Sequence, residues 1–213
     1  ANILPTLRTT TFAIGAETGG ERLTTAVGRA VRPGSLDTHR LSWIFGQGRS
    51  FDAEVVRERT ALEPVAGVVL GSGLSTAVDT VRAASDGEEV EIAYADLPGF
   101  PPPTVAGHAG RVWIGSVGAR ALAIFQGRGH FYEGHGMAMA SITSRVSAEL
   151  GARAMVLTAA VGALDPDVDA GTLVVLRDHL NLMGVNPLSG WRFPDGSPAF
   201  VDIVNGLTHY IKT

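Results

Sequence analysis

The sequence predicts an α/β fold with a mixed, curved β-sheet flanked by helices. Short apolar runs rich in β-branched residues recur along the chain, glycines bound them, and helical patterns separate them. This alternation is typical of a sheet that is largely covered by helices. Of the 213 residues, 45% are hydrophobic and 18% are charged. We therefore expect residues 1–213 to form a single domain with a well-buried core.

The N-terminal quarter gives the weakest patterns. Residues 9–14 have the β-branched and aromatic content of a short strand. Residues 21–31 are compatible with a helix, which Pro33 would end. In residues 51–62 apolar side chains stand among charges, which predicts an amphipathic helix ending before Pro64.

The pattern becomes clear at residue 65. Residues 65–70 are an apolar run followed by Gly71-Ser72-Gly73, which predicts a buried strand, a tight turn and the start of a helix. Residues 137–150 are predicted to be helical. Further strands are expected at residues 111–117, 121–126, 154–160 and 172–176.

Composition excludes several classes of function. The net charge of −4 lacks the basic excess of a nucleic-acid-binding protein. The absence of cysteine excludes disulfides and thiolate metal sites, and no histidine spacing indicates a metal. No apolar run approaches the roughly 20 residues that span a bilayer, so we expect no membrane association. Residues 1–8 show no secretory signal, and we expect a cytoplasmic location.

The turn Gly71-Ser72-Gly73 is a candidate anion site. Glycines let backbone N–H groups approach an anion, a helix N-terminus favours negative charge, and Ser72 adds a hydroxyl donor. An ordinary strand–helix turn explains the same residues equally well. A dinucleotide fold is disfavoured because a third glycine at the required spacing is missing.

The loop at residues 127–135 carries more chemistry. It follows a predicted strand, and ligands gather at the carboxyl ends of strands in open α/β sheets. Arg128 offers a planar fork of donors suited to phosphate. His130 and Tyr132 project to the same side as Arg128 in extended chain. Glu133 could orient a histidine or accept a hydroxyl proton. A solvated polar loop is the less favoured alternative.

Other polar residues carry less weight. His108 lies in a turn, where a lone histidine is usually just exposed. Asp178 and His179 are sequence neighbours, which point to opposite faces of a strand, so a direct acid–base pair is disfavoured. His39 and His209 have no supporting context.

Taken together, these segments resemble the trimeric purine nucleoside phosphorylases. The resemblance covers residues 65–200, whereas residues 1–50 and 203–213 match poorly. The matching segments, in order, are Gly71-Ser72-Gly73-Leu74, Leu97-Pro98-Gly99-Phe100, Gly107-His108-Ala109-Gly110, Gln126-Gly127-Arg128, His130 with Tyr132-Glu133-Gly134, Thr158 with Leu164 and Pro166, Asp178-His179-Leu180-Asn181-Leu182 and Asn186-Pro187-Leu188.

The resemblance implies a pentosyltransferase of nucleoside metabolism and purine salvage. Inorganic phosphate would cleave a purine ribonucleoside or deoxyribonucleoside to the free base and pentose 1-phosphate, with no metal or organic cofactor. It implies a homotrimer in which Phe193 of a neighbouring subunit closes each site. The roles it implies for residues are catalysis for His130 and Glu133, sugar binding for Tyr132, and phosphate binding for Ser72, Arg128, His130, His108 and Ala160.

The sequence also departs from that family. It has Ala159 and Val161 where the family usually has asparagine and a small residue, at the place where the purine approaches the backbone. We expect the family's C-terminal segment, which supplies the purine-binding glutamate and asparagine, to be missing from these 213 residues. The alternative is therefore a non-catalytic homologue that binds phosphate or a pentose phosphate.

Overall fold

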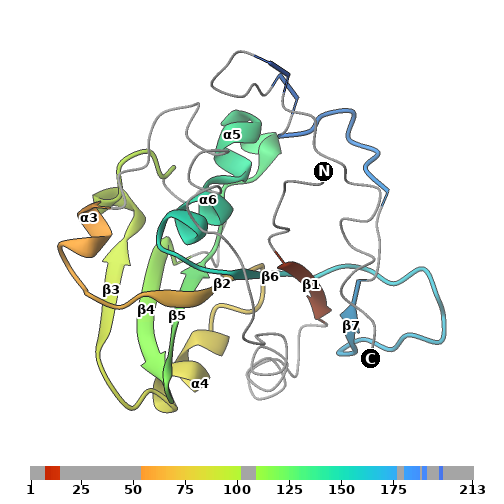
Figure 1. The fold of residues 1–213 in the computed structure, drawn as a ribbon. Helices are drawn as coiled ribbons and strands as arrows, with labels where there is room; N and C mark the ends of the chain where they lie inside the picture. Colours follow the sequence, from red (N-terminus) through yellow and green to blue (C-terminus); the bar gives the residue numbers. More distant parts are fainter. Residues whose placement is uncertain are drawn as a thin grey trace, which may run out of the picture.

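A computed structural model describes residues 8–14, 54–101, 109–176, 180–187, 189–190 and 197–198, and only the backbone course is described for the first of these segments. These segments contain a mixed sheet in the order β3-β4-β5-β2-β6-β1-β7 (Figure 1). Its strands are β1 (Arg8–Ile14), β2 (Pro64–Leu70), β3 (Glu89–Ala93), β4 (Arg111–Val117), β5 (Arg120–Gln126), β6 (Ala154–Ala159) and β7 (Leu173–Val175). The helices are α3 (Glu54–Arg57), α4 (Ala77–Ala83), α5 (Gly136–Ala140) and α6 (Ile142–Glu149), with 3-10 turns η1 (Tyr94–Asp96) and η2 (Phe131–Glu133).

Parallel pairing occupies the middle of the sheet. β2 pairs in parallel with β5 on one side and with β6 on the other, and β6 pairs in parallel with β1. The pairs β3–β4, β4–β5 and β1–β7 are antiparallel. Leu70 is in register with Gln126, and Val69 with Leu157. The carboxyl ends of β5, β2 and β6 therefore lie together at one edge of the sheet.

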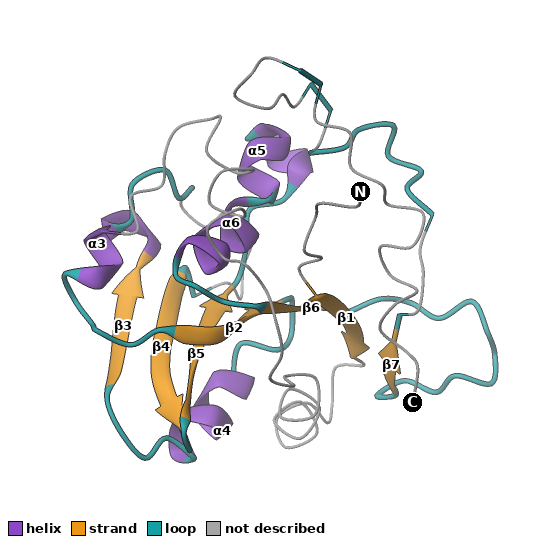
Figure 2. Cartoon of the chain, viewed as in Figure 1, coloured by secondary structure: helices purple, strands orange, loops and turns teal. Residues whose placement is uncertain are grey.

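Helices cover both faces of the sheet, as Figure 2 shows for α5 and α6 on one side and α4 on the other. Alternate residues of each strand enter separate apolar clusters because successive strand side chains point to opposite faces. In β2, Val69 joins the cluster that contains α6, whereas Val68 joins the cluster that contains α4. Phe125 and Ile124 of β5 divide in the same way. The sheet is thus a buried layer, as its apolar strands predicted.

The predicted strands are confirmed, and three helix predictions need correction. The helix predicted at residues 51–62 is described only as α3 (Glu54–Arg57). The Thr60 hydroxyl donates to a carboxylate oxygen of Glu88 at 2.6 Å and accepts from Leu62 N–H at 3.1 Å. The N–H of Leu62 therefore bonds to a side chain and not to a helical backbone carbonyl, just after the helix ends. The segment predicted at residues 137–150 is two helices, interrupted at Ser141 (φ −98°, ψ 1°).

The third correction concerns the glycine turn. The helix that follows begins at Ala77, not at Ser72. Two successive turns intervene, closed by Leu74 N–H to the Gly71 carbonyl at 3.1 Å and by Ala77 N–H to the Leu74 carbonyl at 2.9 Å. Ser72 therefore lies outside the first turn of α4, where the orphan N–H groups of a helix are found. The helix predicted at residues 21–31 lies outside the described residues.

Sequence analysis did not predict β3, which forms the end of the sheet beside β4. Ionic contacts tie this strand to α4 and β4: Arg82 contacts Glu89 and Glu91, each at 3.1 Å, and Arg111 contacts Glu91 at 2.8 Å. The indole N–H of Trp113 also donates to Glu89 at 2.9 Å. Acidic side chains at alternate positions thus serve as partners for arginines of the elements nearby.

The two-sided core makes a testable prediction about stability. Phe125 is fully buried against α6, so Phe125→Ala should lower the free energy of unfolding by about 3–5 kcal/mol. The same substitution at Phe131, which is exposed, serves as the matched control and should cost about 1 kcal/mol or less. Urea denaturation measures both. Equal losses for the two variants would contradict the described packing.

Candidate functional site

Three loops meet where the parallel strands end. Gly71-Ser72-Gly73 follows β2, the stretch that begins at Gly127 follows β5, and Ala160 follows β6. The parallel register of β2 with β5 places the first two loops at one edge of the sheet. Crevices outside the carboxyl ends of parallel strands are the usual place for ligands in open α/β sheets.

Thr158, near the end of β6, joins the three loops. Its hydroxyl accepts from Gly71 N–H at 2.9 Å and donates to the Val69 carbonyl at 2.9 Å. Its carbonyl accepts from Nη1 of Arg128 at 2.9 Å. The residue is 1% exposed, so water does not compete for these bonds. One buried residue thus fixes the backbone before Ser72 and the guanidinium of Arg128 relative to β6.

Gly71 must lack a side chain for this arrangement. A Cβ atom placed on Gly71 would lie 2.4 Å from the Thr158 carbonyl oxygen and 3.1 Å from the Ala159 Cα. Both are backbone atoms, so neither can move aside cheaply. The first glycine of the turn therefore allows β2 and β6 to approach, whereas Gly73 is needed for its positive φ of 79°.

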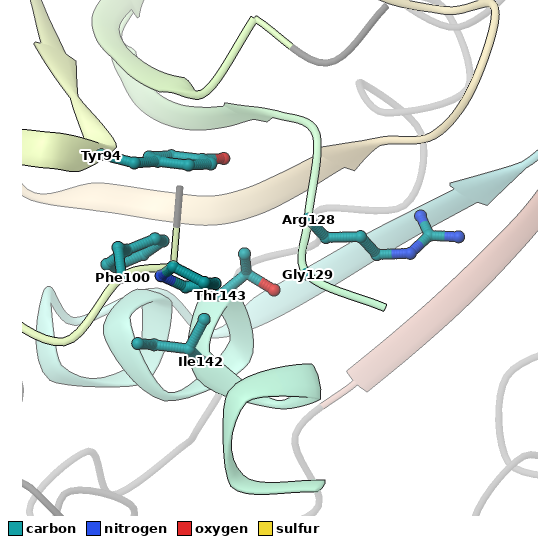
Figure 3. Close-up of a pocket in the computed structure, with 7 residues that line it drawn as sticks. Tyr94, Phe100, Arg128, Gly129, Ile142 and Thr143 are labelled. Carbon is teal, nitrogen blue, oxygen red and sulfur yellow. The ribbon is translucent and has the colours of Figure 1, made fainter. Parts of the chain in front are cut away.

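Hydrogen bonds position Arg128 at two points, the backbone just before it and its guanidinium group. The hydroxyl of Tyr94 donates to the Gly127 carbonyl at 2.8 Å, and burial raises the pKa of Tyr94. A narrow crevice beside the arginine stem has walls too close together to admit a water molecule, and it is lined by Tyr94, Phe100, Pro101, Arg128, Gly129, Ile142 and Thr143. In Figure 3 the guanidinium points away from Tyr94 and Phe100 and towards β6. Burial lowers the pKa of Arg128, which is still far above neutrality for this residue type.

His130 and Tyr132 lie on one side of the loop, as the extended backbone at His130 (φ −102°, ψ 147°) requires. Their rings stack with centroids 4.9 Å apart and planes 17° from parallel. Burial lowers the pKa of His130, the charge of Arg128 lowers it further, and Glu133 acts in the opposite direction. The imidazole is therefore mainly neutral at pH 7, with one N–H donor and one acceptor nitrogen.

Glu133 ends the turn η2 and turns inward. Its side chain is only 6% exposed, and its nearest described ionic partner is Nε2 of His135, 3.5 Å from Oε2. Neither carboxylate oxygen has a hydrogen-bond partner among the residues that the structure describes. A buried carboxylate without hydrogen bonds is costly, which is typical of a functional position.

The predicted site residues differ in their exposure, and several of them lie outside the described part of the chain. Ser72 and Ala160 are exposed at the shared edge, and Arg128 and His130 are partly buried beside them. Tyr132 is 75% exposed. The other predicted residues lie outside the described part of the chain: His108, Phe193, Asp178, His179, His39 and His209.

Two residues of the site carried no assigned role in the sequence analysis. Thr158 belonged only to a matching segment, because a threonine inside an apolar strand gives no local signal for bridging two loops. His135 ends the polar loop at residues 127–135, and its spacing of two from Glu133 was the available signal. No group of three or more histidine, aspartate or glutamate side chains that could hold a metal occurs in the described segments. No helix among them is long and apolar enough to cross a bilayer.

Comparison with known proteins places this arrangement in a family. Residues 66–208, more than half of the chain, match the model of the phosphorylase superfamily. The chain therefore belongs to the phosphorylase superfamily.

Within that superfamily the chain is similar to purine nucleoside phosphorylases. It is 36% identical over 166 residues to purine nucleoside phosphorylase 1 of Bacillus subtilis (strain 168), covering 75% of this chain and 59% of that protein. It is 41% identical over 149 residues to the purine nucleoside phosphorylase of Mycobacterium tuberculosis (strain ATCC 25618 / H37Rv), covering 70% and 54%. The chain thus spans between half and three fifths of the length of these relatives.

A solved structure shows the same likeness. Isoform 2 of purine nucleoside phosphorylase from Schistosoma mansoni, in complex with cytosine and ribose-1-phosphate, has a TM-score of 0.62 and 32% identity, covering 73% of this chain and 54% of that one. The α/β fold predicted from the sequence is therefore confirmed as that of a nucleoside phosphorylase.

The bridging role of Thr158 can be tested by removing its hydroxyl. Thr158→Val leaves the Gly71 N–H without its buried acceptor, so the free energy of unfolding should fall by about 1–3 kcal/mol. Amide hydrogen exchange at Gly71 should become faster. Thr158→Ser retains the hydroxyl, and its Gly71 amide should stay protected. Exchange rates that are the same in the two variants would show that the hydroxyl does not fix this loop.

Proposed function

We propose that this chain carries the phosphate-binding half of a purine nucleoside phosphorylase site. The reaction is phosphate-dependent cleavage of a purine ribonucleoside or deoxyribonucleoside to the free base and pentose 1-phosphate. The observation that carries this proposal is the bonding of the loops after β2 and β5 to Thr158 of β6. Similarity to proteins named purine nucleoside phosphorylase supports it.

The chemistry follows from where an anion would be held. A phosphate oxygen attacks the anomeric carbon of the sugar while the bond from that carbon to the base nitrogen breaks, and the bonding electrons leave with the purine. The sugar passes through an oxocarbenium-like transition state, which a nearby anion stabilises. Fixing phosphate next to that carbon makes the attack effectively intramolecular.

The donors suit a phosphate oxyanion. We assign phosphate binding to the Ser72 hydroxyl, the Arg128 fork and the His130 imidazole, with the Ala160 N–H and His108 as further donors. Arg128 uses one of its N–H groups on Thr158, so its remaining donors are held at a fixed angle. We assign the catalytic roles to His130 and Glu133, because they lie in the same loop and the charge of Glu133 acts on the pKa of His130.

The exposed ring of Tyr132 suits a contact with the sugar. It stacks on His130, so a pentose that touches the tyrosine would lie next to a residue of the phosphate site. The relative from Schistosoma mansoni is in complex with ribose-1-phosphate, which joins the same two chemical groups. We propose inorganic phosphate as co-substrate, no metal or organic cofactor, and a cytoplasmic location.

Arg128 gives the direct test of the phosphate site. Arg128→Lys keeps a positive charge but loses the planar fork, so phosphate binding measured by calorimetric titration should weaken about ten- to hundredfold. Arg128→Ala should weaken it at least as much. Arg120, which lies at the opposite end of β5, provides the control: Arg120→Ala should bind phosphate as the wild type does. Equal binding by wild type and Arg128→Ala would remove the basis of the proposal.

Activity requires a separate measurement. Phosphate-dependent release of hypoxanthine or guanine from inosine or guanosine by the purified chain would support the enzyme. Phosphate binding without base release would support the non-catalytic alternative.

We also propose that copies of the chain associate as a homotrimer, in which Phe193 of a neighbour closes the site. The stretch after β6 exposes large apolar side chains, of which Leu164 is fully exposed. The others among the described residues after β6 are Val161, Val175, Leu176, Leu180, Leu182 and Met183. Isolated soluble chains rarely expose so many, so a protein surface that covers them is the simplest explanation.

Light scattering measures the assembly directly. We expect a particle of three 22.2 kDa chains at micromolar concentration. Leu182→Asp should shift the population towards monomers, because a buried charge without a partner is costly. A stable monomer in the wild type would exclude the trimer.

A further inference from the structure

The phosphate site proposed above contains a charge that works against it. Glu133 lies in the same short loop as Arg128 and His130, and its negative charge acts on His130. A carboxylate next to an anion repels it. Because the side chain is 94% buried, water screens this repulsion poorly. Something in the fold must restrain the carboxylate for Arg128 to hold an anion.

The described partner is His135. Its Nε2 lies 3.5 Å from Oε2 of Glu133 and, like the carboxylate oxygens, has no hydrogen-bond partner among the described residues. The backbone is arranged for this approach. Gly134 (φ 82°) and Gly136 (φ 77°) flank the histidine in conformations that other residues rarely adopt. They let the chain reverse so that the imidazole returns to the carboxylate two residues before it.

The balance of charges shows why the contact matters. With His130 mainly neutral, the charges of Arg128 and Glu133 cancel, and the loop offers an anion no net attraction. The contact with His135 restrains the carboxylate, so that it does not swing towards an anion held by Arg128.

We infer that His135 is a positioning residue of the phosphate site, whose imidazole contacts the Glu133 carboxylate and restrains it, so that Arg128 and His130 can bind the anion. This inference rests on the proposed function. It goes beyond that function by placing control of phosphate binding in a residue that does not itself contact phosphate.

The described elements around Glu133 and His135 contribute few other charged groups. The loop after β5 contributes Arg128, His130 and Tyr132 as its other charged or titratable groups. Helix α5 packs against η2 and contains only glycine, methionine and alanine. Helix α6 contributes Arg145, which is itself buried, and Glu149 at its far end.

The test is calorimetric titration of the full chain with inorganic phosphate at one fixed pH. His135→Gln removes the imidazole that contacts Glu133, so phosphate binding should weaken about fivefold or more. A fixed pH keeps the ionisation of phosphate itself the same for every variant.

Glu133→Gln provides the matched background. If His135 acts by restraining the carboxylate, His135→Gln should change phosphate affinity less than about twofold once Glu133→Gln has removed that carboxylate. A purely structural role would weaken binding equally in both backgrounds, and that result would overturn the inference. Should His135→Gln not fold, His135→Asn, compared in the same two backgrounds, provides the same test.

The control separates two kinds of failure. If wild type binds phosphate no better than Arg128→Ala, the proposed function fails and the inference falls with it. If wild type binds phosphate and Arg128→Ala does not, but His135→Gln binds phosphate as wild type does, the inference alone is wrong.

Discussion

The pair of hydrogen bonds that Thr158 makes with the loops after β2 and β5 is the constraint on which the candidate site depends. The two loops are more than fifty residues apart in the sequence, and β6 is a further thirty residues on. The hydroxyl fixes Gly71 and the carbonyl fixes Arg128, both at 2.9 Å. Because Thr158 is buried, water does not compete for these bonds. They fix the positions of the hydrogen-bond donors of the site, whose strength depends on angle as well as distance.

The electrostatics of the loop after β5 follow from partial burial. Arg128 and Glu133 both act on the pKa of His130, in opposite directions, and all three side chains are shielded from water to some extent. In such a place each charge alters the others more than it would at the surface. A neutral His130 beside a charged arginine is well suited to gain a proton when an anion arrives, because the anion favours the charged imidazole.

The sequence predicted the strands well and the helices less well. Residues 65–70 and 121–126 are apolar along their whole length because both faces of these strands are buried, and that signal is visible without any partner. The strand β3 carries glutamates at alternate positions, so its apolar content is too small to stand out. Helix ends depend on contacts such as that of Thr60 with Glu88, which joins positions 28 residues apart.

By itself the sequence determined which chemistry is available, namely glycines, an arginine, histidines and a carboxylate in loops that follow apolar strands. These are local patterns, and periodicity and composition record them directly. Only the tertiary structure decided that Thr158 unites two of those loops and that His135 meets Glu133. Parallel pairing in register brings the Thr158 bonds together, and it joins segments far apart in the sequence that show no local sign of each other. The approach of His135 to Glu133 is local, but it depends on the backbone conformation of Gly134 and Gly136, which the sequence alone does not fix.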